Sequence, residues 1–354
     1  MVAAMPARVL DPRALHHAFS LAERQVEDGV TPFVILGLAN ADRTIRIEAF
    51  SAPGGARVGT NAVCLLASIT KPIVATAVMR LVERGDLPLT GPLPGVSGAD
   101  WRPFTAWHVL SHTSGLGDVD VERALIDGSD RASYLQRVAA LPQESAPGER
   151  FRYASAPFDV LPEALEARLG RPFETVLRET VLGPLGMTDT TFDPRASLPS
   201  RMAPVDLGEL HERLGPVGQA LVEGYTGLRL AGGGLWSTAG DVLRFGRAML
   251  RGGELDGERV ISRSFLELMT REVTIDGLGA HPDPLQEDHY ALGWGVPSRA
   301  SPTSPGSYGH GGASGTRLWV DPSRDLVVVY LGGSWEMPVT EISRVYAAVY
   351  AALA

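Results

Sequence analysis

The segment Ser68-Ile-Thr-Lys71 places a hydroxyl and an amine at a spacing suited to nucleophilic catalysis. In a helix, residues i and i+3 share a face, with Cβ atoms roughly 5–6 Å apart. A serine hydroxyl becomes a good nucleophile only when a neighbouring base takes its proton. A lysine can act as that base where burial lowers its pKa, whereas an arginine stays protonated in proteins. The spacing therefore allows Ser68 to be a nucleophile that Lys71 activates.

Lys71 is the only lysine in the chain, and all the other basic residues are arginine. If the amine has to lose its proton at this position, arginine is excluded there. The alternative is a surface lysine whose aliphatic stem covers apolar neighbours while its charge stays in water. The spacing leaves both interpretations open, so other segments of the chain have to decide between them.

The composition excludes several classes of function. The 354 residues carry a net charge of −9 and no cluster of basic residues, which argues against binding to nucleic acid or to an anionic membrane surface. The most apolar window, residues 62–79, contains the sole lysine, which would cost roughly 2.5–3.5 kcal/mol in a bilayer, so we expect no membrane span. The first residues lack the apolar run of a signal peptide. We therefore expect a cytoplasmic protein that acts on a small molecule, with its oligomeric state left open.

The other reactive residue types point to neither a metal nor a cofactor. His108 and His112 have the spacing of a zinc-binding helix, but Val109 stands where such a site needs glutamate, so we expect both histidines to pack or to cap. A phosphate-binding loop needs glycine before its lysine, whereas a threonine precedes the sole lysine here. The single cysteine, Cys64, forms no intrachain disulfide and is expected in the core. Two large aromatic residues are expected in the core or, alternatively, in the wall of an acyl pocket: Trp236 and Trp294.

The distribution of strand and helix patterns predicts an α+β fold with an inserted helical domain. Strand-like runs lie near both ends of the chain, in "PFVILGLANADRTIRIEAF" and in "GTRLWVDP" and "DLVVVYLGG". Residues 88–224 instead carry helical patterns separated by Pro and Gly turns. We therefore predict a sheet domain of residues 1–87 and 225–354, an inserted helical domain of residues 88–224, and a site at their interface.

Several short motifs follow one another along the chain. They are "SITK", "WHVLSHTSGL", "APGERFRYAS", "GGGLWSTAGDVLRF" and "YGHGGASGT". In this order they resemble the serine β-lactamase and penicillin-binding-protein superfamily, from about residue 37 to residue 333, and most of all its class C β-lactamases, DD-peptidases and family VIII carboxylesterases. The resemblance implies a β-lactamase/transpeptidase-like fold, in which helices flank an antiparallel sheet and an all-helical domain is inserted.

The resemblance also implies roles for individual residues. Ser68 would be the nucleophile that the substrate acylates, while Lys71 and Tyr153 would share the general-base and general-acid work, with the first proton acceptor left open. The backbone N–H groups of Ser68 and Ala313 would form the oxyanion hole. Four further positions would bind the substrate: Ser155, His310, Gly311 and Gly312.

Two positions depart from the family pattern. Ser155 stands where lactamases and DD-peptidases usually carry asparagine, and His310 replaces the lysine of their Lys-Thr-Gly motif. Both changes weaken the recognition of a peptide-like group or a carboxylate, and Arg317 is the candidate to replace the missing charge. His310 would polarise the substrate, tune Tyr153 or have a purely structural role, and the sequence leaves these alternatives open.

We therefore expect a serine hydrolase that cleaves small carboxylic esters through an acyl-Ser68 intermediate. The alternative within the same fold is an amide hydrolase, such as a weak β-lactamase, a DD-peptidase or a D-amino-acid peptidase. The alternative from a different class is a non-catalytic binding protein. The natural substrate and the preferred acyl-chain length are not determined by the sequence.

Overall fold

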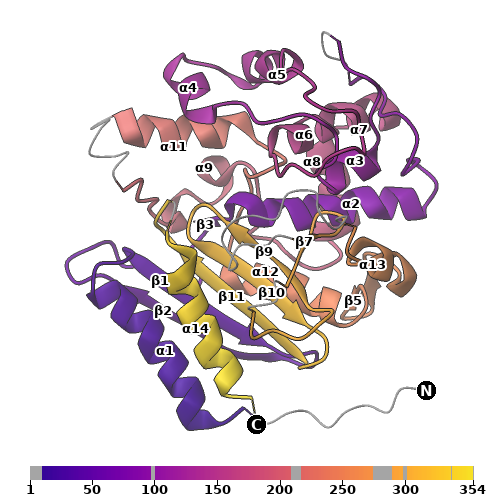
Figure 1. Cartoon of the computed structure of the whole chain (residues 1–354). Coiled ribbons are helices and arrows are strands. Elements are labelled where there is room, and N and C mark those ends of the chain that lie inside the picture. The colour runs from indigo at the N-terminus through magenta and orange to yellow at the C-terminus, as the bar shows by residue number, and fades with distance from the viewer. Residues whose placement is uncertain are drawn as a thin grey trace.

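A seven-stranded antiparallel sheet forms the centre of the computed structural model, which describes residues 10–96, 100–208, 217–273, 289–297, 301–335 and 337–353 (Figure 1). From one edge to the other, the strands are β2 (Thr44–Ser51), β1 (Phe33–Ala39), β11 (Leu326–Gly332), β10 (Thr316–Asp321), β9 (Tyr308–Gly312), β8 (Gly295–Val296) and β7 (His289–Tyr290). Neighbouring strands are antiparallel throughout.

Two neighbouring interior strands, β1 and β11, are buried along their whole length. β1 and β11 are continuous apolar runs, and every residue in both is buried. They pair from Val34 with Gly332 to Ala39 with Val327, which joins the N-terminal hairpin to the C-terminal strands. Strands that are apolar on both faces need covering layers on both sides of the sheet.

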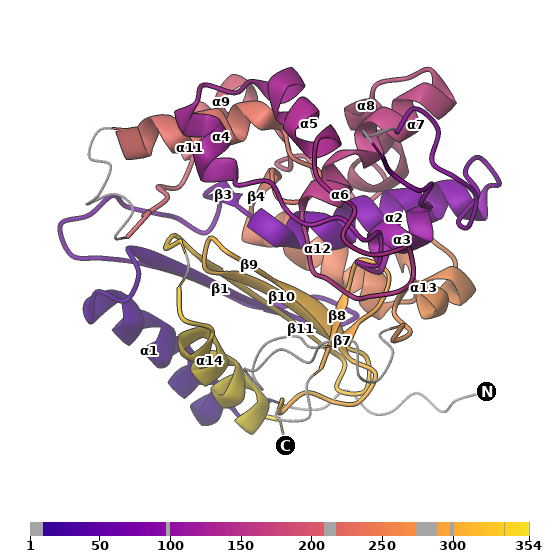
Figure 2. The ribbon, with the colours of Figure 1, turned by 45° about the horizontal axis from the view of Figure 1, so that its top comes forward.

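Helices supply these layers. α1 (Pro12–Glu27) and α14 (Val339–Ala351) lie together on one face of the sheet, and α12 (Ala239–Leu250) packs on the other (Figure 2). α1 begins at the Asp11-Pro12 pair, because the Asp11 side chain accepts hydrogen bonds from the first free N–H groups of the helix. The predicted α+β fold class is confirmed.

A group of helices lies beyond α12, with α2 (Thr70–Glu83) between that group and the sheet (Figure 2). The helices of the group are α3 (Ala106–Leu110), α4 (Val121–Ile126), α5 (Arg131–Ala139), α6 (Ala156–Asp159), α7 (Leu161–Leu169), α8 (Phe173–Leu177), α9 (Pro194–Ser197) and α11 (Val217–Leu228). The shorter elements are β3 (Cys64–Leu65), β4 (Trp236–Ser237), β5 (Glu254–Leu255), β6 (Glu258–Arg259), α13 (Arg263–Met269), η2 (Arg178–Leu182) and η3 (Pro199–Arg201).

The domain boundaries at residues 87/88 and 224/225 stay a prediction. Among the described helices, none is both long and apolar enough to cross a bilayer.

α12 approaches the sheet closely because a glycine stands at its contact point. A Cβ atom on Gly246 would lie 2.5 Å from Cγ1 of Val327 in β11, whereas a Cβ atom on Gly240 of the same helix would have no neighbour nearer than 3.7 Å. A contact as short as the one at Gly246 would force the helix away from the sheet. Position 246 therefore favours glycine.

We expect Gly246→Ala to lower the free energy of unfolding by about 1–3 kcal/mol, because it overpacks the contact with β11. The matched variant Gly240→Ala should raise it by up to about 1 kcal/mol, because alanine is the better helix former. Urea unfolding measures both changes. Equal effects of the two substitutions would contradict the packing described here.

Candidate active site

Ser68 lies in a strained turn at the start of α2. It belongs to the 3₁₀ helix η1 (Ala67–Ile69), and α2 begins two residues later, at Thr70. Ala67 has a φ of 45°, a left-handed conformation that is unfavourable for a residue with a Cβ atom. Such strain persists only where the surroundings fix the backbone. Here the N–H of Leu235 donates to the Thr70 hydroxyl at 3.1 Å and anchors the turn.

Lys71 is fully buried and reaches three oxygen atoms. Its Nζ donates to Oγ of Ser68 at 3.0 Å, to Oγ of Ser155 at 2.9 Å and to the carbonyl oxygen of Gly232 at 2.7 Å. The exposed fraction of Lys71 is 0%, so the interpretation as a surface lysine is wrong. The structure brings Ser68 and Lys71 into direct contact.

Tyr153 lies on the other side of Ser68. Its hydroxyl donates to Oγ of Ser68 at 2.8 Å, and the centroid of its ring lies 4.8 Å from Nζ of Lys71. The side chain of Tyr153 is 40% exposed, so this side of Ser68 is open to an incoming substrate. Either Lys71 or Tyr153 is close enough to accept the proton of Ser68.

The end of β9 lies against the turn that carries Ser68. A Cβ atom on Gly312 would lie 2.4 Å from the carbonyl oxygen of Leu66, so this close approach requires glycine. The hydroxyl of Thr316 in β10 donates to the same carbonyl oxygen at 2.9 Å. These contacts fix the backbone around Ala313, which lines a pocket together with Ser68.

Ser155 is held at the start of α6 by a carboxylate. Its N–H and that of Ala156 donate to Oδ1 of Asp118 at 2.6 and 2.7 Å. Because the backbone is fixed in this way, the Ser155 hydroxyl faces Lys71 and the same pocket. Ser155 therefore lies with Ser68 and Lys71, whereas Asp118 was not predicted from the sequence.

His310 is buried and electrically neutral. Burial, with Lys71 as the next cause, lowers its pKa to about 3. Its Nδ1 lies 2.6 Å from the carbonyl oxygen of Gly311 and must donate to it, so its Nε2 accepts a hydrogen bond from the hydroxyl of Tyr290. His310 therefore carries no charge with which to bind a carboxylate. Its ring centroid lies 6.1 Å from that of Tyr153, at the edge of the site.

Arg317 does not replace the missing charge. Its guanidinium lies over the rings of Trp319 and Tyr346, at 5.1 and 5.5 Å from their centroids. Both aromatic residues belong to the cluster between the sheet and the α1–α14 layer. Because side chains alternate along a strand, Arg317 points away from the face of the sheet that carries Ser68. The prediction that Arg317 replaces the missing lysine charge is therefore wrong.

An apolar pocket of about 250 Å³ opens beside Ser68. Six of its apolar wall residues come from α4, α11 and two loops: Val121, Leu125, Leu207, Leu221, Val222 and Trp335. The polar residues of the wall include Asp118 and Glu122, and among the described residues no arginine or lysine lines this pocket. Trp236 and Trp294 are buried in the core and do not line it.

Comparison with known proteins identifies the family. The sequence matches the Beta-lactamase family model over residues 20–351. The chain belongs to the beta-lactamase family. It is 33% identical to penicillin-binding protein 4 of Amycolatopsis lactamdurans over 296 residues, which cover 78% of this chain and 74% of that protein. It is also 38% identical to esterase EstB of Burkholderia gladioli over 148 residues, which cover 36% and 38% of the two chains.

A solved structure shares the fold over nearly the whole chain. EstCE1, described as a hydrolase with promiscuous acyltransferase activity, aligns with a TM-score of 0.75 at 21% identity, covering 96% of this chain and 99% of that one. The predicted superfamily and the β-lactamase/transpeptidase-like fold are confirmed. Because the members and relatives of the beta-lactamase family are serine hydrolases, the prediction of a serine hydrolase is confirmed as well.

Three residues of this beta-lactamase-family site were not predicted from the sequence: Asp118, Asp159 and Tyr290. Asp159 accepts hydrogen bonds from the N–H of Gly232 at 2.7 Å and from the hydroxyl of Tyr134 at 2.8 Å, and burial raises its pKa to about 7. Its signal in the sequence is one acidic residue within the otherwise apolar segment "APFDVL". Tyr290 begins the segment "YALGWGV", which also resembles the family, and Asp118 lies two positions after the segment "WHVLSHTSGL".

The remaining reactive residues have structural roles. His108 closes a capping box at the start of α3, as expected, and His112 packs against Tyr153 with 4.5 Å between ring centroids. Burial lowers the pKa of His112 well below its usual range. Cys64 is buried, and burial raises the pKa of its thiol, so its expected place in the core is confirmed.

The neutral state of His310 predicts how the stability of this family member depends on pH. An imidazole in the unfolded chain titrates near pH 6.5, whereas His310 in the folded chain titrates near pH 3. Between these values the unfolded state binds the additional proton, so stability falls as the pH decreases through this window, by at most about 1.4 kcal/mol per pH unit for one group.

We expect His310→Asn, whose amide can still donate to Gly311, to lose less stability than the unmodified chain between about pH 6 and about pH 4. Urea unfolding at several pH values measures this slope. His17→Asn, on the exposed side of α1, is the matched control. The same slope in the unmodified chain and in His310→Asn would contradict a neutral, buried His310.

Proposed function

We propose that this chain is an esterase that hydrolyses small, uncharged carboxylic esters through an acyl-Ser68 intermediate. The observation that supports it is the cluster at Ser68, where Nζ of Lys71 and the hydroxyl of Tyr153 lie 3.0 and 2.8 Å from Oγ, beside an apolar pocket. EstB and EstCE1, whose names describe an esterase and a hydrolase, support the same assignment.

In the acylation step, Oγ of Ser68 attacks the carbonyl carbon of the ester, and its proton passes to Lys71 or Tyr153. The negative charge that develops on the carbonyl oxygen is stabilised by the N–H groups of Ser68 and Ala313. When the carbonyl re-forms, the bond to the alcohol oxygen breaks and the alcohol leaves with a proton from the same pair of residues. Water then attacks the acyl group by the reverse sequence and releases the carboxylic acid.

The pocket receives the acyl part of the substrate in this proposal. Its wall contains Ser68, Ser155 and Ala313 but not Tyr153, so the leaving alcohol lies on the open side, near Tyr153. A cavity of about 150 Å³ accommodates benzene, and the pocket of about 250 Å³ has room for a branched or aromatic acyl group.

The charge of the substrate distinguishes the proposed ester hydrolase from the alternative amide hydrolase. β-Lactams and D-alanyl peptides carry a carboxylate, which needs a cation or a strong donor near the site. His310 is neutral, and among the described residues no arginine or lysine lines the pocket. The similarity to penicillin-binding protein 4 is the observation that favours an amide hydrolase, so that activity has to be measured beside ester hydrolysis.

We expect kcat/KM for p-nitrophenyl acetate and butyrate to exceed that for nitrocefin, with Ser68→Ala abolishing both activities. Lys71→Arg should keep the positive charge and still lose at least about 100-fold in kcat, because arginine cannot accept the proton of Ser68. Dominant nitrocefin opening would favour the amide alternative. Absence of both turnover and labelling by a fluorophosphonate probe would favour a non-catalytic binding protein.

Two adjacent residues test the acyl pocket. Leu125 lines it, whereas Ile126, the next residue of α4, is 46% exposed. We expect Leu125→Trp to lower kcat/KM for p-nitrophenyl octanoate roughly 10-fold or more relative to the acetate, because the indole fills the space of the longer chain. Ile126→Trp should leave this ratio unchanged. If the octanoate-to-acetate ratio of kcat/KM is the same in both variants, the acyl group does not bind in the pocket that Leu125 lines.

A further inference from the structure

The third partner of Lys71 is a backbone oxygen in the turn of residues 228–234, and its position depends on a buried carboxylate. The carbonyl oxygen of Gly232 accepts from Nζ of Lys71 at 2.7 Å, while the N–H of Gly232 donates to Oδ1 of Asp159 at 2.7 Å. A Cβ atom on Gly232 would lie 2.8 Å from the carbonyl oxygen of Ser155, so the turn packs tightly against the site. Asp159 and Lys71 are therefore joined through one residue.

Asp159 is fully buried at the end of α6. Its second oxygen accepts from the hydroxyl of Tyr134 at 2.8 Å, and its two hydrogen bonds among the described residues come from neutral groups. Burying a carboxylate without a directly bound cation is unfavourable. The nearby positive charge is that of Lys71, across Gly232.

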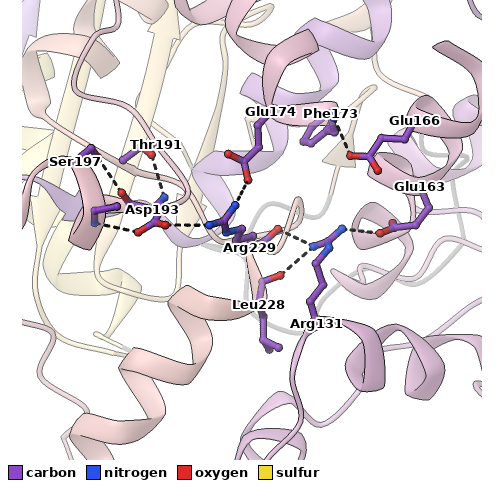
Figure 3. A network of polar contacts seen from close by, with 11 residues as sticks. Arg131, Glu163, Glu166, Phe173, Glu174, Thr191, Asp193, Ser197, Leu228 and Arg229 are labelled. Atoms are coloured by element: carbon purple, nitrogen blue, oxygen red, sulfur yellow. Dashed lines mark hydrogen bonds and ion pairs between the residues drawn. The ribbon is translucent and has the colours of Figure 1, made fainter. Parts of the chain in front are cut away.

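The same turn is fastened on its exposed side by ion pairs (Figure 3). Arg229 pairs with Glu174 and with Asp193, each at 2.9 Å, and Arg131 donates to the carbonyl oxygens of Leu228 and Arg229 at 2.9 and 3.0 Å. Exposed ion pairs stabilise little individually. In the buried half of the turn, the N–H of Gly232 is held by Asp159, and the carbonyl oxygen of the next residue, Gly233, accepts from the hydroxyl of Tyr225 at 3.2 Å.

We infer that Asp159 is a positioning residue: its carboxylate fixes the backbone of Gly232, whose carbonyl oxygen in turn holds the amine of Lys71 in line with Ser68. The inference rests on the proposed function, because it assumes that Lys71 activates Ser68. It adds a residue that touches neither the substrate nor the reacting atoms.

The ionised form of Asp159 is the one that positions Gly232, because a carboxylate accepts a stronger hydrogen bond than a carboxylic acid. The ionisable groups that act on Asp159 come from α2, α5, α11 and the segment before α4: Lys71, Tyr134, Tyr225 and Asp118. With its pKa near 7, Asp159 should make the reactivity of Ser68 rise with pH through neutrality.

The test is the rate at which a fluorophosphonate probe labels Ser68 in the full chain between about pH 5 and about pH 9. The probe reports on the nucleophile whether the natural substrate is an ester or an amide. We expect Asp159→Asn to slow labelling at about pH 8 by on the order of 10- to 100-fold and to remove the rise near neutrality. Tyr134→Phe should shift that rise to higher pH, because the hydrogen bond from Tyr134 lowers the pKa of Asp159.

Glu174→Gln, which loosens only the exposed side of the turn, is the control and should leave rate and profile unchanged. Wild-type labelling kinetics in Asp159→Asn would overturn this inference alone. If Asp159→Asn does not fold, an unshifted pH profile of the labelling rate in Tyr134→Phe would overturn the inference instead. Absence of labelling in the unmodified chain would instead overturn the proposed function, and this inference with it.

Discussion

The arrangement of the site depends on one buried amine. Nζ of Lys71 has no access to water, and its three hydrogen-bond partners come from three separate parts of the chain, the turn before α2, the start of α6 and the turn after α11. Because an unsatisfied buried amine is costly, all three segments have to be in place before Lys71 can be buried. The same requirement places Lys71 beside the hydroxyl of Ser68.

This constraint explains why a chain that otherwise uses arginine keeps one lysine. A lysine amine is compact and can lie among three convergent oxygens, whereas a guanidinium is planar, wider and always protonated. Arginine is used instead where its shape suits the contact, as in Arg131, which bridges Glu163 and two backbone carbonyl oxygens. His310 is neutral and adds no positive charge beside the nucleophile.

Much of the fold and the centre of the site could be predicted because their signals are local. The apolar runs of β1 and β11 and the spacing of Ser68 and Lys71 are visible in short segments. Gly232 and Asp159 contact the site only through tertiary packing, since Gly232 lies 161 positions from Lys71. The assignment of Arg317 failed because its direction depends on which face of β10 it occupies, which a motif does not specify.

Intact-protein mass spectrometry during turnover of an ester shows whether Ser68 becomes acylated. Rapid quenching during hydrolysis of p-nitrophenyl butyrate, followed by peptide mapping, should reveal one butyryl group bound to Ser68 and none elsewhere. Ester turnover without a covalent adduct, or with the acyl group on another residue, would show that Ser68 is not the nucleophile.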